Sequence, residues 1–228
     1  MTNLMEFERR IKMTLESLSK HPSIECEVLR CSPVNEDFGS ASEMLQVIGA
    51  LCNARFPAGT REVLFRFEEV AAQWSLQEST VKLSGEFHVK PLLFAVTAPP
   101  PHISWKEAPK DLQRLHSHFR VIDDTPETGA GIMASMRMGE DSSAPEIWIT
   151  DVSLGTYRMR IDYAAYMENL LVTKGTFGWH YLFTEAPLRE SQFSYVRRNI
   201  QTMLQVFPRI FPGLAYAPLQ ELFAERLR

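Results

Sequence analysis

The most constraining feature of the sequence is a run of three short apolar segments followed by a helix with a marked start. Apolar and polar residues alternate over 132–138, and two further segments, 146–150 and 157–161, follow after turn-forming residues. Alternation with a period of two is typical of a half-buried strand, and tight turns join antiparallel neighbours. Asp162 then occupies the N-cap position of a helix over 163–173. The pattern predicts an antiparallel meander that leads directly into a helix.

The N-terminal part predicts a helix and a strand. Apolar residues recur at steps of three and four over 3–20, which is typical of an amphipathic helix. Asn3 and Glu6 have the spacing of a capping box at its start. From 24 to 29, Ile24, Cys26 and Val28 alternate with Glu25, Glu27 and Leu29, and this favours a short half-buried strand.

Two helices and a strand pair are predicted next. Ser40 and Glu43 have the spacing of a second capping box. The helix that follows is expected to bury Leu45, Ile48 and Leu51. A further helix is expected over 61–70, after a Pro/Gly corner. The segments 71–76 and 85–92 then change to a period of two, which predicts paired strands.

The last third of the chain predicts helices. One is expected from near Leu188 to a point before Pro208, and another over 219–227. The apolar face of the first of these helices is expected to hold Phe193, Val196, Ile200, Met203 and Phe207. Helices, then strands, then helices indicate an α+β fold, in which helices pack on an antiparallel sheet and extra helices lie at both termini. We expect residues 1–228 to form a single domain.

The charge balance disfavours a nucleic-acid partner. The 228 residues include 28 acidic and 24 basic side chains, so the formal net charge is −4. A protein that binds nucleic acid needs a basic surface to neutralise phosphates. A weak negative charge instead leaves room for a basic protein partner.

The cysteines and the hydropathy pattern indicate the cytoplasm. Three cysteines, Cys26, Cys31 and Cys52, cannot all pair, and they lack the dense spacing of a disulfide scaffold. We expect them to be reduced thiols. The N-terminus lacks a signal-peptide pattern, and no run of about 18 apolar residues is present. The sequence therefore predicts a cytoplasmic protein with no membrane partner.

Acidic residues gather between the predicted strands. They are Asp123, Asp124, Glu127, Glu140, Asp141, Glu146 and Asp151. Paired carboxylates can form a glycosidase dyad or bind a divalent metal. Turns also favour Asp and Glu for local reasons, and we expect these residues to lie in turns. As candidate partner-binding residues we take Asp123, Asp124, Glu127, Glu140, Asp141 and Asp151, because an acidic surface needs only proximity.

A histidine pair and an aromatic cluster are weaker candidates for a binding site. His116 and His118 would share a face on a strand and could hold a metal, with Asp123 or Asp124 as a third ligand. A solvated polar loop is the simpler interpretation of the two histidines. The aromatic residues between Phe177 and Phe183 could stack on bases or sugars, but packing at a core edge is the simpler interpretation. No catalytic residue, metal site or cofactor is predicted.

Several segments together resemble the SUKH superfamily, which includes fungal cell-wall synthesis regulators and bacterial immunity proteins. They are ARFPAGTREVLFRFEE (54–69), AAQWSL (71–76), GEFHVKPL (85–92), PEIWITD (145–151) and MRIDYAAYMENLLVTKGTFGWHYLF (159–183). The resemblance places a SUKH-like core at about 40–183, with a further C-terminal helical section at 187–228. It implies an α+β fold and a binding role without catalysis.

The resemblance implies that the protein is an immunity protein, which neutralises a cognate bacterial toxin by direct binding. A basic toxin domain, such as a nuclease, would suit the negative charge. Two alternatives remain open: a regulatory scaffold in cell-envelope or stress control, and a metal-dependent hydrolase that uses the acidic turns with His116 and His118. An enzyme is expected to gather ionisable residues in one pocket, whereas a binding protein is expected to present an open face.

Overall fold

The computed structural model is an α+β fold built on one seven-stranded antiparallel sheet. It describes residues 3–78, 81–101, 109–138 and 144–228. The strands are β1 (Ile24–Cys31), β2 (Val70–Glu78), β3 (Val81–Val89), β4 (Phe119–Asp124), β5 (Ile132–Arg137), β6 (Glu146–Asp151) and β7 (Gly155–Arg158). The helices are α1 (Glu6–Lys20), α2 (Ala41–Cys52), α3 (Leu92–Thr97), α4 (Lys110–Ser117), α5 (Tyr163–Thr173), α6 (Ser194–Ile210) and α7 (Ala217–Arg226). Short 3₁₀ turns are η1 (Glu36–Phe38), η2 (Ala58–Val63), η3 (Trp179–Phe183) and η4 (Ser191–Phe193).

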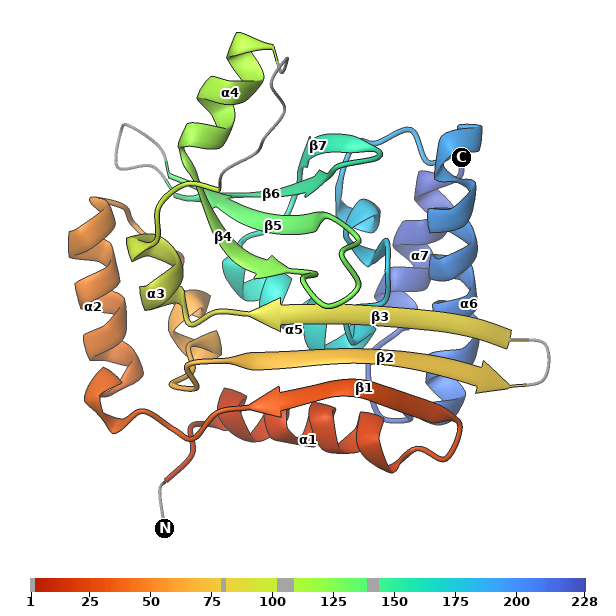
Figure 1. Cartoon of the computed structure of the whole chain (residues 1–228), viewed down its shortest axis with the longest axis horizontal. Coiled ribbons are helices and arrows are strands. Elements are labelled where there is room, and N and C mark those ends of the chain that lie inside the picture. Colours follow the sequence, from red (N-terminus) through yellow and green to blue (C-terminus); the bar gives the residue numbers. More distant parts are fainter. Residues whose placement is uncertain (1–2, 79–80, 102–108, 139–143) are drawn as a thin grey trace.

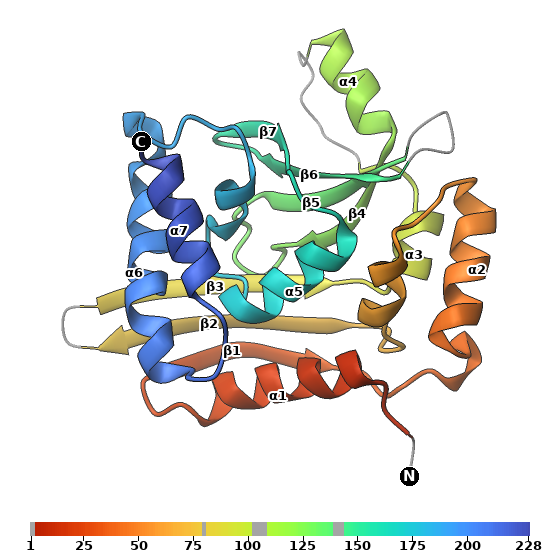
Figure 2. The ribbon, with the colours of Figure 1, turned by 180° about the vertical axis from the view of Figure 1, so that it is seen from behind.

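The strands follow one another in chain order across the sheet, and each is antiparallel to its neighbours. Helices α1, α5 and α7 lie behind the sheet in Figure 1 and in front of it in Figure 2. Among the described residues, no helix crosses the other face of β1, β2 and β3 (Figure 1). The predicted meander is confirmed, and it extends over the whole sheet. β4 is an interior strand, because it pairs with both β3 and β5.

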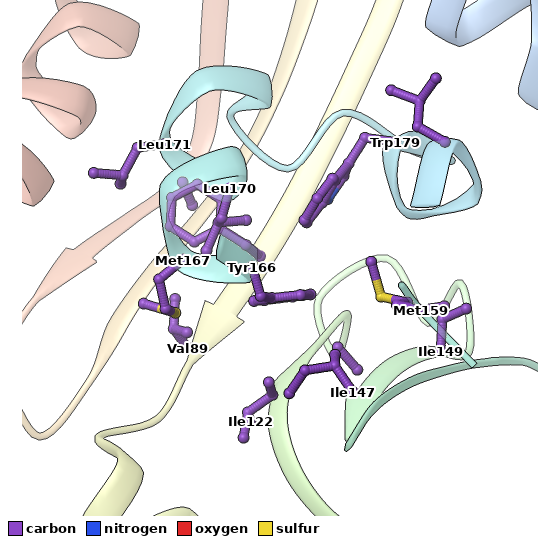
Figure 3. Packing of buried hydrophobic residues seen from close by; sticks show 14 of the residues in the cluster. Val89, Ile122, Ile147, Ile149, Met159, Tyr166, Met167, Leu170, Leu171 and Trp179 are labelled. Atoms are coloured by element: carbon purple, nitrogen blue, oxygen red, sulfur yellow. The ribbon is translucent and has the colours of Figure 1, made fainter. Parts of the chain in front are cut away.

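The core lies between the sheet and the helices behind it. Trp74 of β2 and Trp179 of η3 are almost completely buried, and the rings of Tyr166 and Trp179 are 5.1 Å apart between centroids. Figure 3 shows the side chains of Tyr166 and Met167 projecting from α5 toward the sheet. Each large apolar side chain buried in this way contributes about 1.5–3 kcal/mol to folding. The core is therefore the main source of stability.

Two of the predicted helix caps are confirmed. The Asp162 carboxylate accepts a hydrogen bond from the Ala165 N–H at 2.8 Å, which caps α5. Ser40 and Glu43 form the expected capping box of α2. The first cap prediction is wrong: α1 begins at Glu6, and its N-cap is Met5, whose N–H donates to Glu8 at 2.8 Å. Leu51 is 58% exposed, so it is not part of the buried face of α2.

The segment predicted as a helix over 61–70 is only in part helical. The 3₁₀ turn η2 ends at Val63, and Phe67 then forms an isolated bridge with Val34. Val70 already pairs with Cys31 as the first residue of β2. Pairing with β1 and its following loop thus overrides the helical spacing of the apolar residues.

Helix α6 continues past Pro208, where its end was predicted. It begins at Ser194 and ends at Ile210. A proline lacks the N–H that would bond to the carbonyl four residues earlier, which here is that of Leu204. The side-chain amide of Gln220 on α7 donates to this carbonyl at 3.2 Å instead. The neighbouring helix therefore replaces the missing bond.

The turn after α5 is joined to β3 by backbone pairing. The Glu86 N–H donates to the Gly175 carbonyl at 3.0 Å, and the Phe177 N–H donates to Ser84 at 3.1 Å. A Cβ atom on Gly85 would come within 2.7 Å of both the Gly175 carbonyl and the Trp74 ring. The close approach of these two backbones therefore requires glycine at position 85.

Candidate functional site: the open face of the sheet

The side chains of β1, β2 and β3 that point away from the helices form a polar surface, which we call the open face. Successive residues of a strand point to opposite sides, and directly paired residues share a side. Trp74 and Leu76 point into the core, so Gln73 and Ser75 lie on the open face. The open face carries Glu25, Glu27, Val28 and Arg30 of β1, Ala71, Gln73, Ser75 and Gln77 of β2, and Lys82, Ser84, Glu86 and His88 of β3.

A chain of ion pairs crosses one end of the open face. Arg30 lies between two carboxylates: its Nε is 2.8 Å from Glu69 and its Nη2 is 2.5 Å from Glu127. His88 follows, with Nδ1 2.8 Å from Asp124 and Nε2 3.5 Å from Glu69. These ion pairs therefore link β1, β3 and β4 with the residue that precedes β2. Because each pair is partly exposed, its contribution to stability is small, about 0–1 kcal/mol.

The loop after β4 is anchored on the same face by Glu86. The Glu86 side chain accepts hydrogen bonds from the N–H groups of Glu127 and Thr128, at 2.7 and 3.0 Å, and from the Thr128 hydroxyl. Glu86 is only 3% exposed as a result. This carboxylate holds Glu127 in place beside Arg30.

Negative charge exceeds positive charge on the described part of this surface. The carboxylates are Glu25, Glu27, Glu69, Glu86, Asp124 and Glu127. The lysine and arginine cations are Arg30, Lys82 and Lys90, the last of which pairs with Asp124 at 3.0 Å. The two groups number six and three. Glu25 and Glu27 are exposed, so their charge is available to a partner.

The structure separates the adjacent residues Asp123 and Asp124. Both belong to β4, so the prediction that they lie in a turn is wrong. Asp124 lies on the open face, whereas Asp123 points to the helical side and is 4% exposed. Its carboxyl accepts a hydrogen bond from the Tyr166 hydroxyl at 2.7 Å and one from the His88 N–H at 2.8 Å. Burial raises the pKa of Asp123 to about 7.

The other predicted partner-binding residues are divided between the interior and the surface. Asp151 ends β6 and is 7% exposed, since it accepts hydrogen bonds from the Ser153 N–H and the Tyr181 hydroxyl. Like Asp123, it does not lie where a partner could contact it. Glu140 and Asp141 lie outside the described residues. Asp124 and Glu127 are the two that the structure brings together on the open face.

The histidine pair lies apart from the acidic residues. His116 lies in the last turn of α4 rather than on a strand, and it is 5% exposed, with Nε2 3.2 Å from the Thr156 hydroxyl. Thr156 is three strands away from Asp124 in the sheet register, which corresponds to about 14 Å. Burial lowers the pKa of His116. In the described part of the chain, no group of three or more potential metal ligands is found.

His88 is a pH-sensitive member of the ion-pair chain. The hydrogen bond with Asp124 raises the pKa of His88 and outweighs its burial. A raised pKa adds stability below the unfolded value of about 6.5, and this stability is lost as the pH rises through the folded value. We therefore expect the substitution His88→Gln to destabilise the protein more at pH 5.5 than at pH 8.5. Urea unfolding at both pH values measures the difference, and an equal cost at both would contradict the assignment.

Two residues of the site carried no signal in the sequence. Arg30 and Glu69 lie 39 positions apart and meet only because Arg30 is directly opposite Ala71 in the sheet. Strict alternation in β1 would place Arg30 on the same side as Ile24, and the β-bulge between Cys26 and Val28 brings it to the open face instead.

The described part of the chain contains no helix that is long and apolar enough to cross a membrane. Comparison of the chain with protein-family models, with curated proteins and with solved structures finds no significant match.

Proposed function

We propose that this protein is a non-catalytic binding protein whose open face docks a basic protein partner. The observation that carries this proposal is the uncovered sheet surface on which carboxylates outnumber cations. A surface with an excess of negative charge attracts a positively charged partner and speeds its association. The exposed Glu25 and Glu27, in the first half of the edge strand β1, are the first contacts we expect.

The most concrete form of this function is that of a SUKH-like immunity protein, which neutralises a bacterial toxin by direct binding. The resemblance over Ala54–Phe183 supports it. The resembling segments contribute β2, β3, β6 and α5, the framework around which the open face is built. A nuclease domain with a basic surface is the partner that the charge of the open face suits best.

The proposal is tested with the effector encoded beside the gene. We expect the protein to inhibit a basic nuclease at an equimolar ratio. The double substitution Glu25→Lys/Glu27→Lys reverses two exposed charges and is expected to slow association by about tenfold at low salt. Stopped-flow association and residual nuclease activity measure the effect.

A matched control changes the same charge elsewhere. Glu221 and Glu225 are exposed on α7, behind the sheet, and we expect Glu221→Lys/Glu225→Lys to alter the association rate less than twofold. Equal slowing by both double variants would show that only net charge matters and would contradict docking on the open face. Stable partner binding without inhibition of any effector would favour the regulatory scaffold.

A further inference from the structure

A groove of about 500 Å³ lies on the helical side of the molecule, remote from the open face. It is formed by α1, the end of α5 and the turn between α6 and α7. Its volume is within the range of small-molecule pockets, about 300–1,000 Å³. Met13 and Leu214 line it and are 65% and 38% exposed, so apolar surface is accessible along it.

Lys174 lines this groove and is unusual in its environment. It is the C-cap of α5, with a left-handed φ of 51°, and it is only 2% exposed. The Trp74 indole N–H donates to its backbone carbonyl at 2.7 Å, which fixes the position of the residue. Its Nζ lies 4.4 Å from the centre of the Phe211 ring and 3.5 Å from the Leu171 carbonyl, a long distance for a hydrogen bond.

The ammonium of Lys174 has no anionic partner among the described residues. Burial alone lowers the pKa of Lys174 to about 8, without any compensating carboxylate. The other basic groups along the groove do have partners: Arg10 pairs with Glu168 and Lys20 pairs with Glu16. The residues that line the groove include no Asp or Glu. A buried charge without a partner is costly, and an anion bound beside Lys174 would offset this cost.

We propose that this groove binds a small amphipathic carboxylate, an unbranched fatty acid, with its carboxylate at Lys174 and its chain along the apolar walls. The charge of Lys174 and the absence of acidic side chains favour an anionic head. The apolar residues Leu171, Val172, Phe211 and Leu214 favour a hydrocarbon chain. The site is independent of the open face, so it stands whether or not the proposed partner binding is correct.

Calorimetry of the full chain with octanoate and 1-octanol tests the proposal. We expect octanoate to bind at least tenfold more tightly than 1-octanol, since only octanoate pairs with Lys174. Decanoate has two more methylenes and is expected to bind about fifteenfold more tightly than octanoate. No saturable binding of either acid at millimolar concentration would overturn the proposal.

Lys174→Met and Lys20→Met are matched variants that each remove one lysine of the groove. Lys174→Met replaces the ammonium by an apolar group of similar length, so it is expected to fold, which circular dichroism checks. It should bind octanoate and 1-octanol with equal affinity. Lys20→Met removes an exposed lysine and should keep the preference for octanoate. A preference that survives in Lys174→Met would overturn the assignment of the carboxylate to Lys174.

Discussion

Replacing Arg66 by methionine is expected to destabilise the protein by about 3–5 kcal/mol at pH 7. Glu8 of α1 has a completely buried side chain, and Arg66 binds it three times at 2.9 Å, through its backbone N–H, Nε and Nη2. Burial acts to raise the pKa of Glu8, but the bonds from Arg66 and the Met5 N–H outweigh it and lower the pKa. Arg66→Met leaves a buried carboxylate without its cation. Chemical denaturation measures the loss.

The double variant Glu8→Gln/Arg66→Met separates charge from packing. A neutral glutamine still accepts hydrogen bonds from the N–H groups of Met5 and residue 66, and no buried charge remains. We therefore expect the double variant to be more stable than Arg66→Met alone. If both lose the same free energy of unfolding, the loss comes from the packing of the arginine rather than from an unpaired carboxylate.

Replacing Lys174 by methionine is expected to have the opposite effect and to stabilise the protein by about 3 kcal/mol at pH 7. Burial lowers the pKa of Lys174 from 10.5 to about 8, and at about 1.4 kcal/mol for each tenfold change this corresponds to about 3 kcal/mol. This free energy is the cost of keeping the unpaired Lys174 ammonium in an apolar groove. Apolar groups of similar shape often replace buried charges with a gain in stability.

The pH dependence of this gain checks its cause. Between pH 8 and 10.5 the unfolded state binds more protons at Lys174 than the folded state, so wild-type stability attributable to this group rises with pH. The advantage of Lys174→Met should therefore shrink over this range. Lys20→Met changes an exposed lysine that pairs with Glu16 and is expected to alter stability by less than about 0.5 kcal/mol at any of these pH values. If the stability gain of Lys174→Met stayed the same between pH 8 and 10.5, the gain would come from packing rather than from removal of the charge.

Local signals in the sequence were reliable where no distant residue competes with them. The caps at Ser40 and Asp162 are bonds between a side chain and an N–H three residues away, so the sequence contains both partners. The predicted cap at Asn3 failed because Glu8, rather than Glu6, is held by Met5 and by Arg66 from another part of the chain. The helix expected over 61–70 was lost to strand pairing in the same way.

The candidate site shows a similar limit. Acidic residues near positions 123–127 were recognisable in the sequence, and two of them, Asp124 and Glu127, do lie on the open face. Asp123 has the same chemistry as its neighbour but belongs to the interior, because consecutive strand residues point to opposite sides. The predicted turn would have placed both Asp123 and Asp124 at the surface. The true strand separates them.

The α+β class, the order of the strands in the meander, the apolar face of α6 and two helix caps could be predicted from the amino-acid sequence, since they depend on periodicity and on contacts within a few residues. Which side of the sheet stays uncovered, and which carboxylates face it, follows only from how the helices pack. The same packing puts Lys174, at the end of a correctly predicted helix, in an apolar groove whose lining residues include no carboxylate. Burial and pairing between residues distant in the chain depend on how the helices pack on the sheet, and no local pattern of residues contains that information.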